Sequence, residues 1–289
     1  MITGGASGIG AATAKLLKAK GAVPVLIDCD AQQLAATAAD LNAPSFCVDV
    51  TDYAACEAAV AQTLATHCRI DVVWANAGIA SFGPLLLTDI QAFKRCIEVN
   101  VFGTLNIVRA ALPAVIAQRG YVLATASVSS FAHPPAVSSY AASKAAVEAM
   151  CNSWRIELGA HGVCVGTIYA SWVQTPLVTE GDMHPAFVRL KSTMPPAMRR
   201  ALPVEAAASM IVDGIARRAR RIWVPGWVRI LHWLRAALHT PLAERPLLQA
   251  APEMEKLFLE TIASSGVKAS SVAPRELARE QPPATAAIK

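Results

Sequence analysis

Charged and aromatic residues are scarce in this sequence. Asp, Glu, Lys and Arg make up 16% of its 289 residues and aromatic residues 6%, whereas 54% are hydrophobic. This composition suffices for one large core, and two full domains would be cramped in this length. The net charge is only +5, and the basic residues are spread along the chain apart from a cluster between Arg217 and Arg221. Nucleic acid is therefore not an expected partner.

The sequence also lacks paired cysteines, a leader and a long apolar run. Its seven cysteines form no CxxC pair and no metal-ligand spacing, so we expect no metal site and interpret them as reduced, buried thiols of a cytoplasmic protein. The opening Met-Ile-Thr-Gly-Gly has none of the basic and apolar stretches of a signal peptide. The longest uncharged stretch, residues 120–143, contains Ser, Pro and His, and we expect no membrane span.

Short apolar runs of β type alternate along the chain with longer Ala-rich segments of helical period. This alternation is typical of βαβ units around a parallel sheet. We predict one α/β domain, a doubly wound parallel sheet with helices on both faces. Its strands are expected at 23–28, 45–50, 70–75, 120–126, 163–168 and 222–225. Its helices are expected at 9–20, 31–41, 53–67, 90–117, 139–160 and 204–219.

A glycine-rich turn near the start of the chain runs directly into the first helical segment. Glycines there allow positive φ and a close approach of the backbone to a pyrophosphate, whose charge the free N–H groups of the helix start favour. An ordinary strand-to-helix connection is the alternative for such a turn taken alone. The residues expected to contact a dinucleotide are Thr3, Gly4, Ser7, Gly8, Ile9 and Gly10.

Asp28 closes the second strand about 20 positions after Gly8, where an acidic side chain would accept hydrogen bonds from the adenosine ribose hydroxyls. A carboxylate at this position would repel the 2′-phosphate of NADP, so Asp28 favours NAD. The alternative is that Asp28 caps the following helix, although Asp30 is also placed for that role.

Tyr140 and Lys144 are four residues apart in a helical segment, so both side chains project from one helix face. A phenol of pKa about 10 is a poor base at neutral pH, and a neighbouring ammonium is expected to lower that pKa. Ser127 follows the strand that precedes this helix, where its hydroxyl would hold a substrate oxygen against the tyrosine. Ser129 and Ser130 are rivals for that role.

These residues together resemble the short-chain dehydrogenase/reductase family, in its branch marked by TGxxxGxG and YxxxK. The resemblance runs from Thr3 to about Pro225. It implies a Rossmann-type fold and a catalytic tetrad in which Asn100 joins the three residues above, its distorted helix holding a water that connects the lysine to solvent. It also implies that the cofactor contacts Tyr140 and Lys144 themselves. The further cofactor residues that it implies are Asp49, Val50, Asn76, Ala77, Gly78, Val173 and Thr175.

The resemblance implies an NAD-dependent oxidoreductase that moves a hydride between the nicotinamide and a secondary alcohol or ketone. Tyr140 would exchange the hydroxyl proton, Ser127 would orient the oxygen, and Lys144 would lower the tyrosine pKa and hold the nicotinamide ribose. One alternative is an NADPH-dependent acyl-chain ketoreductase, which Asp28 opposes. Another is a catalytically silent dinucleotide sensor or membrane-associated binding protein on the same fold, which has no need of the tetrad.

The chain departs from the family pattern at two places. Only Met1 and Ile2 precede the glycine turn, so we expect the central strand to be almost absent and the true start to lie upstream. After the sixth strand the family commonly has Pro-Gly, whereas this chain has Ala170 and Ser171, followed by Trp172, which would narrow the substrate side of the cleft.

The sequence suggests a substrate site and three segments. Residues 1–225 would form the catalytic domain with a substrate lid at about 176–202, residues 226–263 an amphipathic helical extension, and residues 264–289 a disordered tail. The Met-containing apolar lid favours a lipophilic alcohol or ketone of steroid, retinoid or fatty type, unless these residues only pack the lid onto the sheet. The pocket residues proposed are His133, for which an ordinary loop role is the alternative, and Trp172, Met183 and Phe187.

Two surfaces suggest partners. One is a helix from Gly226 with Arg and His residues beside an apolar face, as in an interfacial helix. The residues expected on that apolar face are Trp227, Ile230, Leu231, Leu234 and Leu238. Residues 226–240 would then contact a membrane peripherally, or, as the alternative, cover the substrate cleft or a neighbouring subunit. The helix of Tyr140 is apolar on more than one stripe, which favours a homo-oligomer, a dimer or tetramer.

Overall fold

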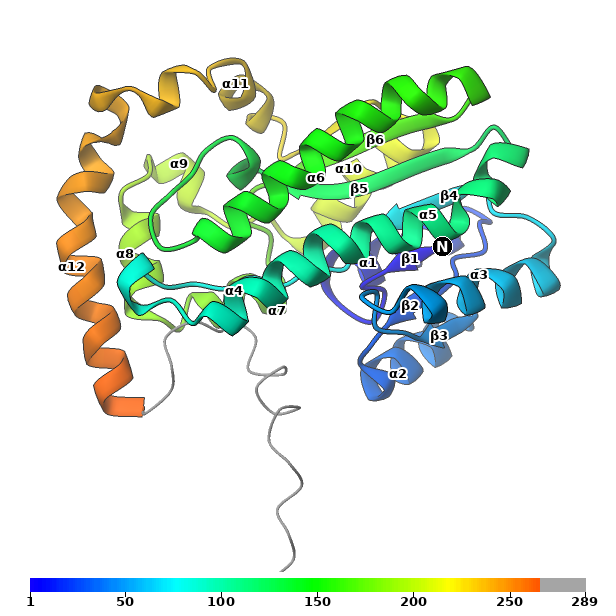
Figure 1. Cartoon of the computed structure of the whole chain (residues 1–289), viewed down its shortest axis with the longest axis horizontal. Coiled ribbons are helices and arrows are strands. Elements are labelled where there is room, and N and C mark those ends of the chain that lie inside the picture. The colour runs from blue at the N-terminus through cyan, green and yellow to red at the C-terminus, as the bar shows by residue number, and fades with distance from the viewer. Residues whose placement is uncertain (266–289) are drawn as a thin grey trace, which may run out of the picture.

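A sheet of parallel strands runs through the middle of the molecule (Figure 1). The computed structural model describes residues 1–265, and its seven strands follow the order β3-β2-β1-β4-β5-β6-β7. The predicted doubly wound parallel sheet is therefore confirmed, and each predicted strand is present with its ends shifted by a few residues. The strands are β1(Ile2–Thr3), β2(Leu26–Asp28), β3(Ser45–Cys47), β4(Val72–Ala75), β5(Tyr121–Ser127), β6(Cys164–Ala170) and β7(Arg221–Val224).

The central strand β1 has only two residues, as expected, yet it pairs on both sides. Ile2 lies opposite Leu26 of β2 and opposite Trp74 of β4, and its side chain is buried. The terminal amine of Met1 donates a hydrogen bond to the carbonyl oxygen of Val72 at 2.8 Å, and burial lowers the pKa of this amine to about 5. The glycine turn after β1 is thus held between both halves of the sheet.

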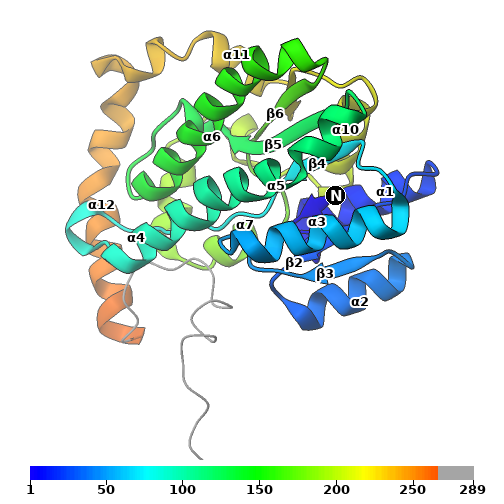
Figure 2. The same cartoon turned by 45° about the vertical axis from the view of Figure 1, so that its right-hand side comes forward.

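Helices cover both faces of the sheet and give it two hydrophobic cores (Figure 2). On one face pack α1(Gly8–Ala19), α2(Ala31–Leu41) and α10(Val204–Ala216), which contribute Ala14, Leu34 and Ile211 to the core. On the other pack α3(Tyr53–His67), α5(Gly103–Ala117) and α6(Ser138–Glu157), which contribute Val60, Ile107 and Val147. The strands between them are apolar on both faces because both are buried.

The helix predicted at 90–117 contains a break in its regular winding. It consists of α4(Ile90–Ile97), the π-helical turn η2(Glu98–Phe102) and α5. By length and composition this helix is apolar enough to cross a membrane, but half of its most apolar window is buried inside the fold, as is usual for a core helix. The short turns η1(Leu85–Leu87), η3(Val128–Ser130) and η4(Leu158–His161) link the other elements.

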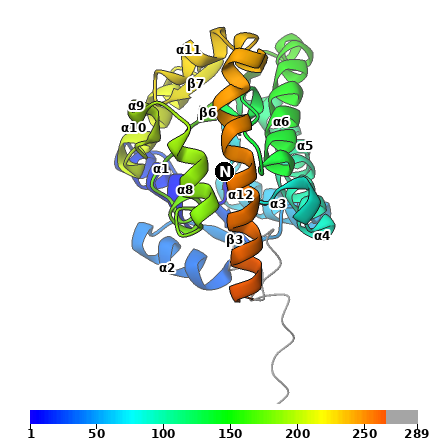
Figure 3. The same ribbon diagram turned by 90° about the vertical axis from the view of Figure 1, so that its left-hand side faces the viewer.

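The lid and the C-terminal segment lie together at one end of the molecule, with α12 beside α8 (Figure 3). The lid region comprises α7(Pro176–Gly181), α8(Pro185–Ser192) and α9(Pro196–Arg199). After β7 follow α11(Val228–Trp233), η5(Ala237–His239) and α12(Pro241–Ser265). A third core cluster joins Phe187 and Leu190 of α8 to Met254 and Phe258 of α12. The C-terminal helix therefore packs on the lid.

The prediction of a single amphipathic helix over residues 226–240 is wrong, because the segment contains the short helices α11 and η5 with a turn between them. This segment curves, and while Trp227, Leu231 and Leu238 pack against the core, Ile230 and Leu234 are exposed. A chain that bends over the end of the sheet can turn residues inward at irregular spacing, so the assumed helical face does not exist. The expected tail lies outside the described residues, apart from residues 264 and 265 at the end of α12.

The expectation that all seven cysteines are buried is also wrong. Cys56, Cys96 and Cys151 are buried, and burial raises the pKa of each thiol. The thiols of Cys29, Cys47 and Cys68 are exposed. They lie at the carboxyl ends of strands or helices, where the chain leaves the core.

Candidate active site

The strand order reverses between β1 and β4, and parallel sheets form their ligand crevices at the carboxyl ends of strands at such a point. Gly4 follows β1 and Asn76 follows β4. Gly4 has a φ of +63°, and a Cβ there would lie 3.0 Å from the Ala77 Cα atom and from Asn76 Nδ2. Only glycine therefore lets the two strand ends approach each other this closely.

Thr3 and Gly10 hold the glycine turn in place from the side away from the crevice. The Oγ1 atom of Thr3 accepts hydrogen bonds from the backbone N–H groups of Asn76 (2.9 Å) and Ala77 (3.0 Å). At Gly10 a Cβ would lie 2.1 Å from the carbonyl oxygen of Gly4, so α1 can start against the turn only with glycine there. These contacts place the start of α1, with its free N–H groups, at the edge of the crevice.

Asp28 ends β2 beside this turn. Its Oδ2 accepts a hydrogen bond from Ala6 N (3.0 Å) and its Oδ1 one from Asp30 N (3.1 Å). Helix α2 is capped by Asp30, which accepts from Gln33 N at 3.1 Å. The alternative in which Asp28 caps this helix is therefore wrong, and Asp28 faces the crevice.

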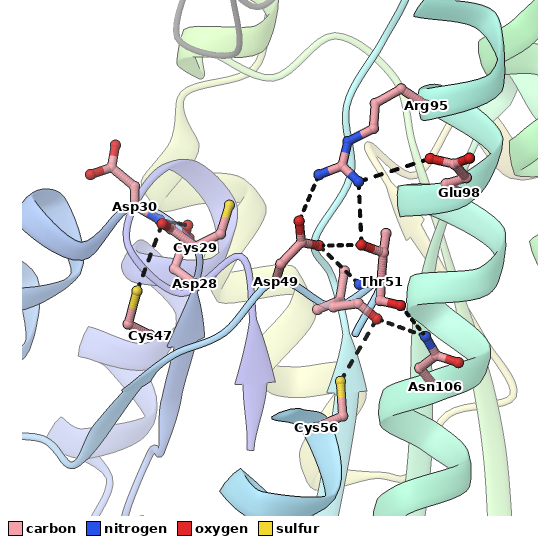
Figure 4. Close-up of polar contacts among 11 residues, drawn as sticks. Asp28, Cys29, Asp30, Cys47, Asp49, Thr51, Cys56, Arg95, Glu98 and Asn106 are labelled. Carbon is pink, nitrogen blue, oxygen red and sulfur yellow. Dashed lines mark hydrogen bonds and ion pairs between the residues drawn. The ribbon is translucent and has the colours of Figure 1, made fainter. Parts of the chain in front are cut away.

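Asp49 follows β3, the neighbour of the strand that Asp28 ends, and is paired with Arg95 of α4 (Figure 4). Arg95 Nη2 donates to Asp49 Oδ2 at 2.7 Å, and Thr51 donates to Asp49 Oδ1 through both its N–H and its hydroxyl. Burial alone would raise the pKa of Asp49, but the hydrogen bonds from Thr51 and Arg95 outweigh burial and lower it. The carboxylate is thus fixed in its charged form.

Tyr140 and Ser127 meet at the carboxyl end of β5. Tyr140, on the first turn of α6, is close enough to Ser127 for the serine to lower the pKa of the phenol, and the Ser127 hydroxyl donates to the carbonyl oxygen of Ala170 at 3.3 Å. The Ser127 hydroxyl also accepts from Ser129 N at 3.1 Å. The hydroxyl of Ser130 instead donates to the carbonyl oxygen of Lys144 at 3.0 Å and accepts from Ser127 N. Among the three candidate serines, Ser127 is therefore the one whose hydroxyl lies at the tyrosine, and Ser130 stabilises the backbone.

Lys144 lies one turn after Tyr140 and is buried. Its Nζ donates to the carbonyl oxygen of Thr125 at 2.8 Å and lies 5.6 Å from the centre of the Tyr140 ring. Burial lowers the pKa of Lys144 to about 8 and raises that of Tyr140 to about 12, although Ser127 opposes the second shift. The expected lowering of the tyrosine pKa is thus reversed, because desolvation of the phenolate outweighs the interaction with Ser127.

Asn100 lies in the π-helical turn η2, in agreement with the distorted helix that the resemblance implies. Its Nδ2 donates to the carbonyl oxygen of Ile79 (2.9 Å) and to Ser143 Oγ (2.8 Å), and its Oδ1 accepts from Ile79 N. A Cβ built on Gly78 would lie 3.1 Å from both Asn100 Oδ1 and Lys144 Nζ. Because Gly78 has no side chain, the space next to these two atoms stays open.

One cavity of about 650 Å³ collects most of these residues. Among the residues singled out from the sequence, Thr3, Gly10 and Asn100 lie behind its wall instead of lining it. Those that line it at the cofactor and catalytic end are Gly4, Ser7, Gly8, Ile9, Asp28, Asp49, Val50, Asn76, Ala77, Gly78, Ser127, Tyr140, Lys144, Val173 and Thr175.

The apolar half of the cavity contains three of the four proposed pocket residues. His133, Trp172 and Phe187 line it, but Met183 does not, because it lies in the turn between α7 and α8 with 73% of its surface exposed. Trp172 is fixed by an edge contact with Phe187, with ring centres 5.3 Å apart, and its indole N–H points to Met194 Sδ at 3.4 Å.

Known proteins resemble this chain in sequence and in fold. Residues 1–184 match the model of the short chain dehydrogenase family. The chain belongs to the short-chain dehydrogenase/reductase family. It is 31% identical to 11-beta-hydroxysteroid dehydrogenase A of Sesamum indicum over 249 residues, which are 81% of this chain and 70% of that protein.

Solved structures of other short-chain dehydrogenases share the fold. One from Burkholderia phymatum in complex with NAD has a TM-score of 0.72 and 26% identity, over 83% of this chain and 94% of that one. The 3-ketoacyl-(acyl-carrier-protein) reductase of Brucella melitensis complexed with NADH has a TM-score of 0.69 and 25% identity, over 77% and 94% of the two chains. This short-chain dehydrogenase is an oxidoreductase of alcohol or ketone groups that uses a nicotinamide dinucleotide.

The sequence did not indicate several residues of this dehydrogenase's cavity. Arg95 is far from Asp49 in sequence, and no motif surrounds it. The apolar half is completed by residues of the lid, α11, η5 and the first turns of α12, which only the path of the chain brings together. The lid contributes Leu190, Met194 and Met198, and the segment 226–240 contributes Trp227, Leu231 and Leu238, both in line with roles considered from the sequence, whereas Glu244 and Leu247 of α12 had no signal there.

Proposed function

We propose that this short-chain dehydrogenase transfers a hydride between NAD and a secondary alcohol or ketone carried on a lipophilic molecule. Asn100, Ser127, Tyr140 and Lys144 would form its catalytic tetrad. The observation that carries the proposal is the position of Tyr140, which faces the same cavity as Ser127, Lys144 and the glycine turn.

The cavity fits a nicotinamide dinucleotide at one end. Gly4 and Gly8 line this end, α1 begins there with free N–H groups, and Asp28 would lie on the ribose side. Thr175 would contact the nicotinamide carboxamide beside Tyr140. When bound, the cofactor supplies or accepts the hydride.

The side chains of the tetrad would handle the proton and the substrate oxygen. With a pKa of about 12, the Tyr140 phenol is protonated at neutral pH and ready to donate its proton to a carbonyl oxygen. Ser127 would donate a hydrogen bond to the same oxygen. Lys144, whose pKa is about 8, carries its charge at neutral pH and would stabilise the phenolate left after the transfer. Asn100 would hold the backbone of Ile79 beside this group.

A lipophilic substrate is supported by the apolar half of the cavity. Trp172, Phe187, Leu231 and Leu247 surround a space that only a few polar side chains enter. The name of one relative, a hydroxysteroid dehydrogenase, agrees with a substrate of this kind. NAD is preferred over NADP because the Asp28 carboxylate opposes a 2′-phosphate, which also weighs against an NADPH-dependent ketoreductase.

The proposal is tested with hydroxysteroids, retinoids, fatty alcohols and small diols, each with NAD and NADP, followed at the absorbance band of the reduced nicotinamide. We expect turnover of a lipophilic alcohol with NAD. Tyr140→Phe should lower kcat by about a thousandfold or more and leave NAD affinity within about twofold, because the phenol acts on the substrate proton. Substantial activity in this variant, or turnover of small diols alone, would contradict the proposal.

We also propose a homo-oligomeric assembly and a cytoplasmic location. Phe102, Leu105 and Ile156 expose apolar surface on η2, α5 and α6, which supports a homo-oligomer through these elements. Light scattering after gel filtration would detect a dimer or tetramer, and a monomer would contradict the proposed homo-oligomer.

Of the two roles considered for residues 226–240, we favour cleft covering over membrane contact because Trp227, Leu231 and Leu238 line the cavity. A cytoplasmic location is proposed from the reduced state of Cys56, Cys96 and Cys151, the three buried thiols.

A further inference from the structure

Glu148 is a buried carboxylate on the helix that carries Tyr140 and Lys144. The three residues are spaced four apart on α6 and so share one face of the helix. Only 6% of the Glu148 side chain is exposed. Burying a carboxylate is unfavourable unless a partner compensates its charge, so the surroundings of Glu148 have to provide one.

Its partners come from the segment after the last strand. Arg235 Nη1 donates to Glu148 Oε1 at 2.9 Å, and His232 Nε2 lies 3.5 Å from the same oxygen. The Oε2 atom is buried and has no hydrogen-bond partner within residues 1–265. Desolvation lowers the pKa of His232 despite Glu148, so the ring is neutral at pH 7 and the guanidinium of Arg235 supplies the compensating charge.

Aromatic side chains fix His232 in this position. Its ring centre lies 5.2 Å from that of Phe131, 5.1 Å from that of Trp223 and 5.5 Å from that of Tyr169. A few residues later, His239 donates through Nε2 to the carbonyl oxygen of Phe131 at 3.1 Å. The segment is therefore attached to the catalytic part of the molecule at two places, one of them ionic.

The same segment forms a wall of the cavity. Trp227, Leu231, Leu238 and His239 line its apolar half, and η5 leads directly into α12, which packs on the lid. Residues 226–240 are called the cover segment below. The two residues that contact Glu148, His232 and Arg235, lie between cavity-lining residues of the same segment. Release of the segment from Glu148 is therefore expected to displace the cavity wall.

We propose that Glu148 is a positioning residue whose ion pair with Arg235 latches the cover segment over the substrate half of the cavity. The latch sets the affinity for bulky apolar substrates, whereas small substrates and the cofactor do not depend on it. This inference rests on the proposed function only in assigning the covered half to the substrate. The attachment itself is independent of any reaction.

The first test is a double-mutant cycle of Glu148→Gln and Arg235→Gln in the full-length enzyme. For a bulky substrate we expect each variant to raise KM about fivefold to tenfold and the double variant to raise it no further, because both remove one shared interaction. The kcat value and the dissociation constant of NAD should stay within about twofold. Arg235→Lys should restore most of the affinity. Arg229→Gln, on the exposed side of the same segment, is the matched control and should change nothing.

The second test needs no substrate. Limited trypsin digestion of the folded protein, read by mass spectrometry, should cleave after Arg229 and Arg235 about fivefold faster in Glu148→Gln than in the parent. Both side chains are exposed already, and release of the latch lets the backbone around them unfold locally, as cleavage requires. Unchanged cleavage would refute the latch. Faster cleavage with unchanged KM for every substrate would refute its role in substrate affinity. If the parent enzyme turned over no alcohol or ketone, the proposed function would fail while the digestion result still decided the latch.

Discussion

Replacing Lys144 by methionine should make the protein more stable while abolishing its activity. Burial lowers the pKa of this lysine from 10.5 to about 8, and one pKa unit corresponds to about 1.4 kcal/mol. The buried ammonium therefore costs about 3 kcal/mol of folding free energy at neutral pH. Methionine keeps the length and removes the charge, but it also loses the hydrogen bond to Thr125, worth about 1 kcal/mol. A net gain of about 2 kcal/mol is expected at pH 7.

The pH dependence of this gain identifies its cause. Since the pKa of Lys144 is lower in the folded than in the unfolded chain, the unfolded chain binds more protons between about pH 8 and 10.5. The cost is therefore complete below pH 8 and disappears as the pH rises through 10.5. The stability difference between variant and parent should shrink by about 2 kcal/mol between about pH 7 and pH 10.

Equilibrium unfolding in urea at the two pH values measures this difference, because groups that titrate alike in both proteins cancel. Lys15→Met, on the exposed side of α1, is the matched control and should show no such change with pH. A Lys144→Met variant that is less stable than the parent at pH 7, or whose stability difference is the same at both pH values, would refute the argument from desolvation.

Two further predictions concern the cofactor and the catalytic groups. Asp28→Asn keeps the shape of the side chain but removes its charge, so the preference for NAD over NADP, measured as a ratio of kcat/KM values, should fall by about tenfold or more. A parent enzyme with the same kcat/KM for NAD and NADP would contradict the role of Asp28 in cofactor selection. Gly78→Ala places a methyl group 3.1 Å from both Asn100 Oδ1 and Lys144 Nζ and should lower kcat by about tenfold, whereas Gly159→Ala, which meets no atom within 4 Å, should not. Equal kcat values for these two variants would show that the space beside Gly78 is not used.

Much of the fold and of the cofactor end followed from local sequence patterns. The helices at 31–41 and 53–67 were predicted with their observed bounds, because Asp30 and Asp52 cap them and apolar residues recur at helical spacing. Tyr140 and Lys144 share a helix face through spacing alone. Asn100 was indicated only by the family resemblance, since nothing in the composition around it predicts a π-helical turn.

The errors arose where distant segments meet. Residues 226–240 were treated as one helix because their apolar residues fit its period. Contacts with β6, β7 and α6 instead hold the segment in a bent path, which divides those residues between core and solvent. Met183 was assigned to the pocket because a methionine in the lid suits an apolar ligand, yet the turn between α7 and α8 points its side chain outward. Helical periodicity describes one element at a time and carries no information about which side of it another element will cover.

The alternating α/β fold, the glycine turn and the Tyr140–Lys144 pair follow from the sequence, because each depends on residues a few positions apart. The electrostatics of the site and the shape of the substrate half arise only from three-dimensional packing. Desolvation of Tyr140 depends on the elements that surround it, and it reversed the direction expected for the tyrosine pKa. The ion pairs Asp49–Arg95 and Glu148–Arg235 join residues 46 and 87 positions apart. Such pairs form only when packing of the apolar cores brings their elements together, which no local pattern encodes.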